Sequence, residues 1–173
     1  MDREEKDFLL ERIMIEYGNE LVRLAFYYVK DAEVAKDLVQ NTFIKCYKNL
    51  ESFRFDAQIK TWLYRITINE CKDYLKSWYA KHVAAASDDI FTQTQSADCV
   101  EAQIVQQEQD DELVRAVLAL PIKYREVIYL CYYEEQSMKE IADILQLNES
   151  TVKTRLRTAK QLLKKRLERE ERG

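Results

Sequence analysis

A cluster of basic and hydrogen-bonding side chains near the C-terminal end is the strongest chemical signal in this 173-residue chain. Residues 150–167 contain seven Lys or Arg side chains and no Asp or Glu, although the whole chain has a formal charge of −4. At about 100° per residue, several of these side chains share one helical face. The members of that face are Ser150, Lys153, Thr154, Arg157, Thr158 and Gln161. Such groups bond to base edges and phosphates in duplex DNA, so the block predicts a local polyanion site.

Enzymatic and metal chemistry find little support in the composition. The chain has one histidine (His82), two glycines, one proline and four cysteines, which are Cys46, Cys71, Cys99 and Cys131. The cysteine spacings match no metal-ligand motif, and two glycines cannot build a glycine-rich phosphate loop. We therefore expect no catalytic residue, metal, cofactor or small-molecule substrate. The cysteines are interpreted as packing residues of a reduced compartment, with a redox sensor at Cys99 or Cys131 left open, and His82 as an exposed residue.

A helix-turn-helix is the element that would position the basic face. Ser137 and Glu140 predict a capping box at the start of a short helix over residues 137–145. Residues 146–148 form the turn, and a second helix follows over 149–169. The positions expected to face the interior are Ile141, Ala142, Leu145, Leu147, Val152, Leu156, Ala159 and Leu163. The alternative is a helical hairpin whose basic face is merely solvated.

Helical periodicity dominates the rest of the chain, and the shortage of Gly and Pro argues against a multistranded sheet. The expected helices are residues 8–28 with a break at Gly18–Asn19, 31–46 with Asp31 as N-cap, 60–79, 98–119 and 123–133. Residues 81–112 carry eight acidic side chains and one basic side chain. We predict an all-α fold of two small helical domains, residues 1–82 and 98–173. A flexible acidic linker over 83–97 would join them.

Three groups of short sequence motifs occur in order along the chain. They are DAE at 31–33 with DLVQNTF at 37–43, Phe53 with KTWLYRI at 60–66 and Asn69, and LPIKYREVI at 120–128 with VKTRL at 152–156. The first resembles region 2.2, the second regions 2.3 and 2.4, and the third region 4 of the extracytoplasmic-function (ECF) sigma factors of bacterial RNA polymerase. The resemblance covers nearly the entire chain.

The resemblance implies a promoter-specificity factor that is not an enzyme. Region 2 would dock on the β′ clamp helices of core RNA polymerase, and region 4 would bind the β flap. Polymerase binding is thereby placed on Asp37, Gln40 and Asn41, and helical geometry adds Ile44 to the same outward face. Asn41 stands where the family usually has an acidic residue. The alternative is a polar, exposed face on which Asp37 pairs locally.

Promoter DNA would be contacted by both domains. For the −10 element, which region 2 melts and captures, the resemblance implies the loop over 52–59 and the helix after it. The residues expected there are Ser52, Phe53, Phe55, Lys60, Arg65, Asn69, Lys72 and Lys76, with Tyr64 as a further stacking face and Trp62 in the core. For the −35 duplex they are Ser150, Thr151, Lys153, Thr154, Arg155, Arg157, Thr158, Lys160 and Gln161. Lys164, Lys165 and Arg166 would extend this surface to phosphates.

The sequence also bears on where the protein acts and on its regulatory partner. The N-terminus is charged, and no apolar run of membrane-spanning length occurs, so no signal peptide or membrane span is predicted and a cytoplasmic location is expected. The resemblance implies an anti-sigma factor, which in this family is commonly anchored in the membrane.

One alternative is a stand-alone helix-turn-helix regulator with an N-terminal helical partner-binding domain, which would normally dimerise on paired half-sites. Another is a helical module that binds only proteins.

Overall fold

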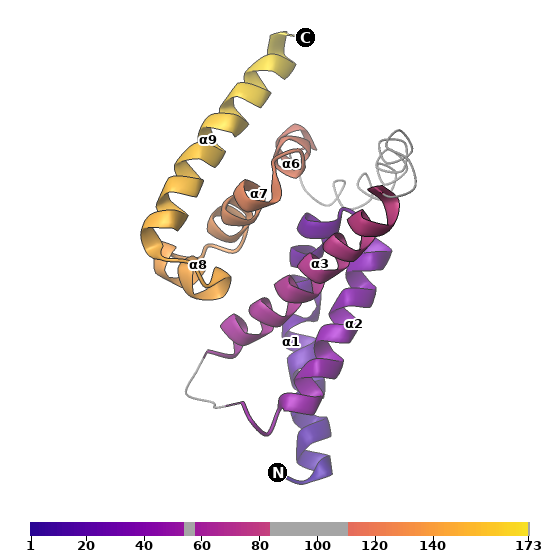
Figure 1. The fold of residues 1–173 in the computed structure, drawn as a ribbon. Coiled ribbons are helices and arrows are strands. Elements are labelled where there is room, and N and C mark those ends of the chain that lie inside the picture. Colours follow the sequence, from indigo (N-terminus) through magenta and orange to yellow (C-terminus); the bar gives the residue numbers. More distant parts are fainter. Residues whose placement is uncertain (54–57, 84–110, 173) are drawn as a thin grey trace. The chain divides into compact units, whose positions relative to one another are not determined.

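The computed structural model describes residues 1–53, 58–83 and 111–172, and all regular structure within these ranges is helical (Figure 1). The helices are α1 (Arg3–Val29), α2 (Ala32–Asn49), α3 (Ile59–Val83), α6 (Asp111–Leu118), α7 (Ile122–Ile128), the π-helix η1 (Tyr129–Tyr133), α8 (Met138–Leu145) and α9 (Glu149–Arg172). The chain divides into two compact units, residues 1–100 and 101–173. The prediction of an all-α fold with two helical domains is confirmed. Apart from Val83, the expected linker lies outside the described residues, as do residues 98–110 of the expected fourth helix.

The first unit is a bundle of α1, α2 and α3, which pack against one another. Local signals fix where its helices begin. Asp2 and Glu5 form a capping box at the start of α1, with the Glu5 N–H donating to Asp2 Oδ1 at 2.8 Å. The carboxylate of Asp31 accepts from the N–H groups of Glu33 and Val34 at 3.0 and 3.2 Å, which confirms Asp31 as the N-cap of α2. The fully buried core includes Leu21, Leu24, Phe26, Cys46, Leu63 and Cys71.

The expected break at Gly18–Asn19 is wrong, because α1 is a single helix of 27 residues. Glycine weakens a helix by its conformational freedom, yet packing of α1 against α2 and α3 holds this segment helical. A Cβ atom built on Gly18 would meet no atom within 4 Å. The folded protein therefore has room for a side chain at this position.

Changing Gly18 to alanine is expected to raise the free energy of unfolding by about 0.5–1 kcal/mol. Alanine restricts the unfolded chain and favours the helix, while the open space around Gly18 imposes no steric cost. Urea unfolding followed by circular dichroism measures the change. An unchanged or lower midpoint would show that the helix needs glycine at this position.

The second unit is built around α9, which packs against α6, α7 and α8. Its core includes Val114, Val117, Val127, Leu130, Ile141 and Val152. The helix expected over 123–133 is in fact α7 followed by a π-helical segment, η1. Polar groups also lie within this core: Arg125 donates through Nη2 to the carbonyl oxygen of Leu120 at 2.9 Å, and the Tyr129 hydroxyl donates to Glu134 Oε1 at 2.6 Å. Within the described ranges, no helix combines the length and the apolar composition of a membrane-spanning segment.

Candidate functional site

The helix-turn-helix of the second unit begins as the sequence predicts. The Glu140 N–H donates to Ser137 Oγ at 3.1 Å, and the Ser137 N–H donates to Glu140 Oε1 at 3.2 Å, which is the expected capping box. After Leu145 the chain turns through Gln146, whose φ of 57° lies in the left-handed region. The Gln146 N–H bonds back to the carbonyl oxygen of Ala142 and ends α8. This turn sets the direction in which α9 leaves.

Asn148 fixes the start of α9, a role that the sequence analysis missed when it placed this residue in the turn. Asn148 Oδ1 accepts from the Thr151 N–H at 3.0 Å, from Ser150 Oγ at 3.1 Å and from Thr151 Oγ1 at 2.5 Å. The Thr154 hydroxyl donates to the carbonyl oxygen of Ser150 at 3.0 Å. Asparagine is among the favoured N-cap residues, so the residue type at position 148 could have indicated the start of the helix. These bonds cap the first turn of α9.

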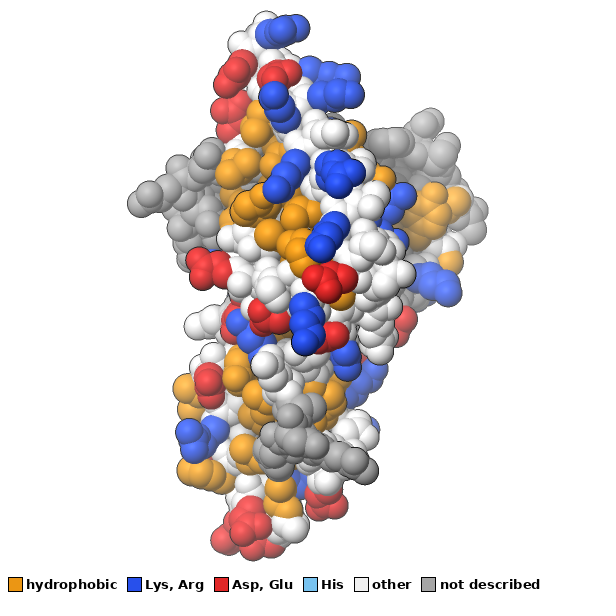
Figure 2. Space-filling model, turned by 90° about the vertical axis from the view of Figure 1, so that its left-hand side faces the viewer, with side chains coloured by type: hydrophobic (Ala, Val, Ile, Leu, Met, Phe, Trp, Pro, Cys, Tyr) orange, Lys and Arg blue, Asp and Glu red, His pale blue; other side chains and the backbone are white. Residues whose placement is uncertain are grey.

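The two faces of α9 differ as predicted. Val152, Leu156 and Ala159 are buried, while Leu163 is half-buried. Of the nine residues expected at duplex DNA, the exposed ones are Ser150, Lys153, Thr154, Arg157, Lys160 and Gln161, and the half-buried ones are Thr151, Arg155 and Thr158. The extending residues Lys164, Lys165 and Arg166 are also exposed. Figure 2 shows Lys and Arg side chains gathered over α9, as a polyanion site requires.

Lys160 has a specific partner. Its Nζ lies 5.6 Å from the centroid of the Tyr132 ring on η1, and a hydrogen bond with the Tyr132 side chain raises the pKa of Lys160. Lys153 and Arg157, in contrast, make no ion pair with any residue in the described ranges. Lys160 is thus directed at η1, while Lys153 and Arg157 are displayed to solvent.

The outward face of α2 carries the residues expected to bind polymerase. Asp37, Gln40, Asn41 and Ile44 are all exposed, with Ile44 at 53%. Lys36 bonds to Glu33 at 3.5 Å, and Asp37 has no ion pair among the residues that the structure describes. The alternative, in which Asp37 forms an ion pair with a nearby residue, is therefore not seen within the described residues. An acidic and polar face with one apolar residue is suited to a basic protein surface.

The start of α3 holds an ionic cluster that the sequence pattern does not reveal. Lys60 Nζ lies 2.9 Å from Glu20 Oε1, and the Tyr64 hydroxyl donates to the same oxygen at 2.5 Å. Lys60 also lies over the Tyr64 ring, 5.4 Å from its centroid. Tyr64 is fully buried, so its expected role as a stacking face is wrong. The charge of Lys60 is therefore partly neutralised by Glu20.

Phe53, which follows α2, and Trp62, near the start of α3, form an aromatic pair. The rings of Phe53 and Trp62 are stacked, with centroids 4.4 Å apart and an angle of 19° between their planes. Trp62 was expected in the core, but both side chains are only half-buried. Ser52 is exposed and donates through Oγ to the carbonyl oxygen of Asn49 at 2.8 Å, which shapes the turn after α2. Phe55 lies outside the described residues.

The basic stripe along α3 is present in part. Asn69, Lys72 and Lys76 are exposed, and Arg65 is half-buried. Their spacing of three and four residues keeps them on one side of the helix. A cationic track of this kind follows the backbone of a single nucleic-acid strand, and exposed aromatic faces stack on its bases. The half-buried Phe53–Trp62 pair is an aromatic surface near the start of this helix.

The thiols and the histidine show no site chemistry. Cys46 and Cys71 are fully buried, and desolvation raises the pKa of each thiol to about 12. Cys131 is half-buried, and burial raises its pKa as well, whereas Cys99 lies outside the described ranges. The expectation that His82 is simply exposed is wrong: its ring stacks on Trp78 at 4.1 Å, and Nδ1 lies 2.8 Å from the Trp78 carbonyl oxygen. No cluster of metal-binding side chains occurs among the described residues.

At pH 8, the thiols of Cys46 and Cys71 are expected to resist alkylation by iodoacetamide in the folded protein and to react within minutes in urea. Only the thiolate reacts, and a pKa of about 12 leaves almost none of it. Mass spectrometry of tryptic peptides after timed labelling measures the rates. Modification of either peptide at the same rate with and without urea would contradict the buried placement.

Comparison with known proteins gives matches to both units. The family model for sigma-70 region 2 matches residues 13–79, and that for sigma-70 region 4 matches residues 110–163. The chain is 33% identical to the ECF RNA polymerase sigma factor SigW of Bacillus subtilis (strain 168), over 87% of this chain and 84% of that protein. It is 30% identical to RNA polymerase sigma factor SigV of the same organism, over 94% and 93% of the two chains.

A solved structure shares the fold. The sigma factor RpoE of Bartonella quintana, crystallised with the anti-sigma factor NepR, matches with a TM-score of 0.70 and 20% identity. The match covers 94% of this chain and 98% of that chain. At this identity the likeness concerns the fold alone.

Proposed function

This chain belongs to the ECF sigma factors, which direct RNA polymerase to promoters, and from that premise we propose which of its residues do so. The α2 face of Asp37, Gln40, Asn41 and Ile44 binds the β′ clamp helices of core polymerase. The observation that carries this assignment is the exposure of all four side chains on one side of α2, within the part that matches region 2. The unit of residues 1–82 is the polymerase-binding and −10 domain.

The −10 element is captured at the turn after α2 and along α3. The half-buried Phe53–Trp62 stack supplies an aromatic surface for an unpaired base, and Asn69, Lys72 and Lys76 follow the strand. Arg65 supports this track from a half-buried position. Among the residues expected at this element, Lys60 acts mainly through Glu20 and Tyr64, as a support of the helix start.

The −35 duplex is read by α9 in the domain of residues 98–173. The N-terminal turns of a recognition helix contact base edges in the major groove, while basic residues further along contact phosphates. Ser150, Lys153, Thr154 and Arg157 are exposed on those first turns, behind the Asn148 cap. The same domain binds the β flap.

Regulation and location follow from the family. We infer an anti-sigma partner, as in the RpoE–NepR complex whose sigma factor shares this fold. A membrane-anchored inhibitor would hold the protein at the inner face of the cytoplasmic membrane, and release would place it on polymerase in the cytoplasm. The chain has no enzymatic role in this scheme.

Run-off transcription with bacterial core polymerase, on a pool of genomic promoter fragments, tests the proposal. New transcripts are expected only when the protein is present. Asp37→Ala is expected to weaken binding to core polymerase by about tenfold or more, the size of effect seen when a hot-spot residue of an interface is truncated. Asp73→Ala, at an exposed aspartate of α3, is the matched control and should co-elute like wild type.

The outcomes separate the rival functions. Transcripts that vanish with Asp37→Ala but persist with Asp73→Ala support the assignment of the α2 face. If wild type neither co-elutes with core polymerase nor yields transcripts, the proposal fails. A stand-alone DNA-binding regulator would then be the better explanation.

A further inference from the structure

Glu20, in the second half of α1, joins that helix to the first turn of α3. Lys60 Nζ lies 2.9 Å from Glu20 Oε1, and the Tyr64 hydroxyl donates to the same oxygen at 2.5 Å. Lys60 and Tyr64 are four residues apart on α3, so they lie one above the other on one side of the helix. One carboxylate thus holds two points a full turn apart, which fixes both the position and the rotation of the start of α3.

Glu20 also supplies a charge that α3 lacks. The positive end of a helix dipole lies at its N-terminus, where acidic side chains are favourable and basic ones are not. The first turns of α1 and α2 contain acidic residues, whereas that of α3 contains none and has Lys60 as its second residue. The carboxylate of Glu20 offsets both the helix dipole and the charge of Lys60. The start of α3 therefore depends on a residue from another helix.

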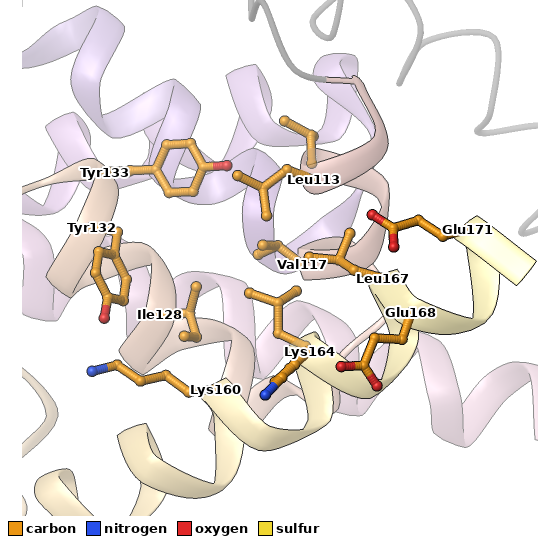
Figure 3. Close-up of a pocket in the computed structure, with 12 residues that line it drawn as sticks. Leu113, Val117, Ile128, Tyr132, Tyr133, Lys160, Lys164, Leu167, Glu168 and Glu171 are labelled. Carbon is orange, nitrogen blue, oxygen red and sulfur yellow. The ribbon is translucent and has the colours of Figure 1, made fainter.

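The contact of Lys160 with Tyr132 in the second unit shows what such a pair does without an acid. Lys160 Nζ lies 5.6 Å from the centroid of the Tyr132 ring, much as Lys60 lies 5.4 Å from that of Tyr64. Lys160 and Tyr132 are both exposed and lie side by side at the edge of an apolar groove, as Figure 3 shows. Tyr64, in contrast, is fully buried. Glu20 is thus the group that makes a lysine–tyrosine contact into an anchor between two helices.

The Phe53–Trp62 stack lies on the opposite side of the anchored turn. Trp62 is two residues from both Lys60 and Tyr64, so at about 100° per residue its side chain leaves α3 on the side away from theirs. Its ring stacks on Phe53, which follows α2, with 4.4 Å between the centroids. A rotation of the first turn of α3 would therefore move the Trp62 ring relative to Phe53.

We propose that Glu20 is a positioning residue for capture of the −10 element. It sets the rotation of α3 that holds Trp62 against Phe53, the surface on which an unpaired base stacks. This inference rests on the proposed function of the first unit. In this scheme neither Glu20 nor Lys60 contacts DNA. Loss of the anchor is expected to weaken binding of the single strand by about 5- to 150-fold, the range that corresponds to one base–aromatic stack.

Exchange of the charges at Glu20 and Lys60 separates positioning from direct contact with DNA. Fluorescence anisotropy with polymerase holoenzyme measures affinity for two probes from a promoter found by run-off transcription: a single strand with the −10 sequence and a duplex with the −35 sequence. E20K and K60E should each weaken binding of the single strand and leave binding of the duplex unchanged. The double variant E20K/K60E restores an ion pair, and its new carboxylate lies one turn from the Tyr64 hydroxyl. It should bind both probes like wild type.

Fluorescence of Trp62 gives a second readout, which a general loss of stability would not produce. The chain has two tryptophans, so W78F leaves Trp62 as the only one. In that background, below the melting midpoint of each variant, E20K should raise the quenching of Trp62 by acrylamide, and E20K/K60E should return it to the value of the W78F parent. If E20K does not fold, E20Q replaces it, because its amide oxygen still accepts from Tyr64 but leaves Lys60 without its anion.

E16K is the matched control, because Glu16 is exposed one turn before Glu20 on α1 and undergoes the same change of charge. It should bind the single strand at least as well as wild type, since a gain of positive charge favours binding of DNA. Equal single-strand affinities for E20K and wild type overturn the inference, and so does an equal loss in E16K. A double variant that stays as weak as K60E also overturns it and makes Lys60 a direct DNA contact. A wild-type holoenzyme that yields no transcripts overturns the proposed function, and this inference with it.

Discussion

Replacing Arg157 by alanine is expected to weaken binding of the −35 duplex by about 5- to 150-fold, or about 1–3 kcal/mol. The guanidinium is exposed on the third turn of α9 and has no ion pair among the described residues. Its planar donor fork can contact the two acceptors of guanine at once, and alanine cannot replace it. Fluorescence anisotropy with polymerase holoenzyme at one fixed salt concentration measures the change, on a promoter found by run-off transcription.

Two further variants test whether the effect depends on the position of Arg157 and on its guanidinium group. Arg169→Ala removes the same exposed group about 18 Å further along α9 and should change affinity much less. Arg157→Lys keeps the charge but loses the fork, so it should rescue a phosphate contact and fail to rescue a base contact. Equal affinities for Arg157→Ala and Arg169→Ala would remove Arg157 from the recognition surface.

A second large effect is expected in the core of the first unit. Ile13→Ala should lower the free energy of unfolding by about 2–5 kcal/mol, because it leaves a cavity where the side chain was. Ile13 is 3% exposed, whereas Ile15, two residues along the same helix, is 77% exposed. Ile15→Ala should therefore stay within about 0.5 kcal/mol of wild type. Urea unfolding monitored by circular dichroism measures both.

Comparing these two variants isolates the contribution of burial to the free energy of unfolding. Both exchange isoleucine for alanine within α1, so the gain in helix propensity is nearly the same and cancels in the difference. A similar loss in both variants would mean that α1 is buried on the side that the structure leaves open. A similar absence of loss would mean that α1 is not packed at Ile13.

The features that followed from sequence are those decided within one turn of helix. Asp31 caps α2, and Ser137 with Glu140 caps α8, because each bond joins residues two or three positions apart. The outward placement of Asp37 and Arg157 follows from helical periodicity, which the buried positions around them also obey. Asn148 was missed although its signal is local, because a turn and an N-cap favour the same residue type.

The features that failed depend on distant partners. The Tyr64 hydroxyl meets Glu20 across 44 residues, so no local pattern shows that Tyr64 is buried and Lys60 engaged. The stack of Phe53 on Trp62 joins the turn after α2 to the start of α3, and periodicity alone placed Trp62 in the core. At Gly18, packing outweighed the weak helix propensity of glycine.

The hydroxyl groups at the start of α9 have a consequence for which bases the protein can prefer. Ser150 and Thr151 donate their protons to Asn148 Oδ1, and Thr154 donates its proton to the Ser150 carbonyl oxygen. With those protons committed, the oxygens can offer only lone pairs to DNA. Their complements in the major groove are the amino groups of adenine and cytosine, while guanine and thymine oxygens need the cationic donors Lys153 and Arg157. In the proposed role of α9, the internal bonding of its start thus divides the surface that faces the bases into an accepting half and a donating half.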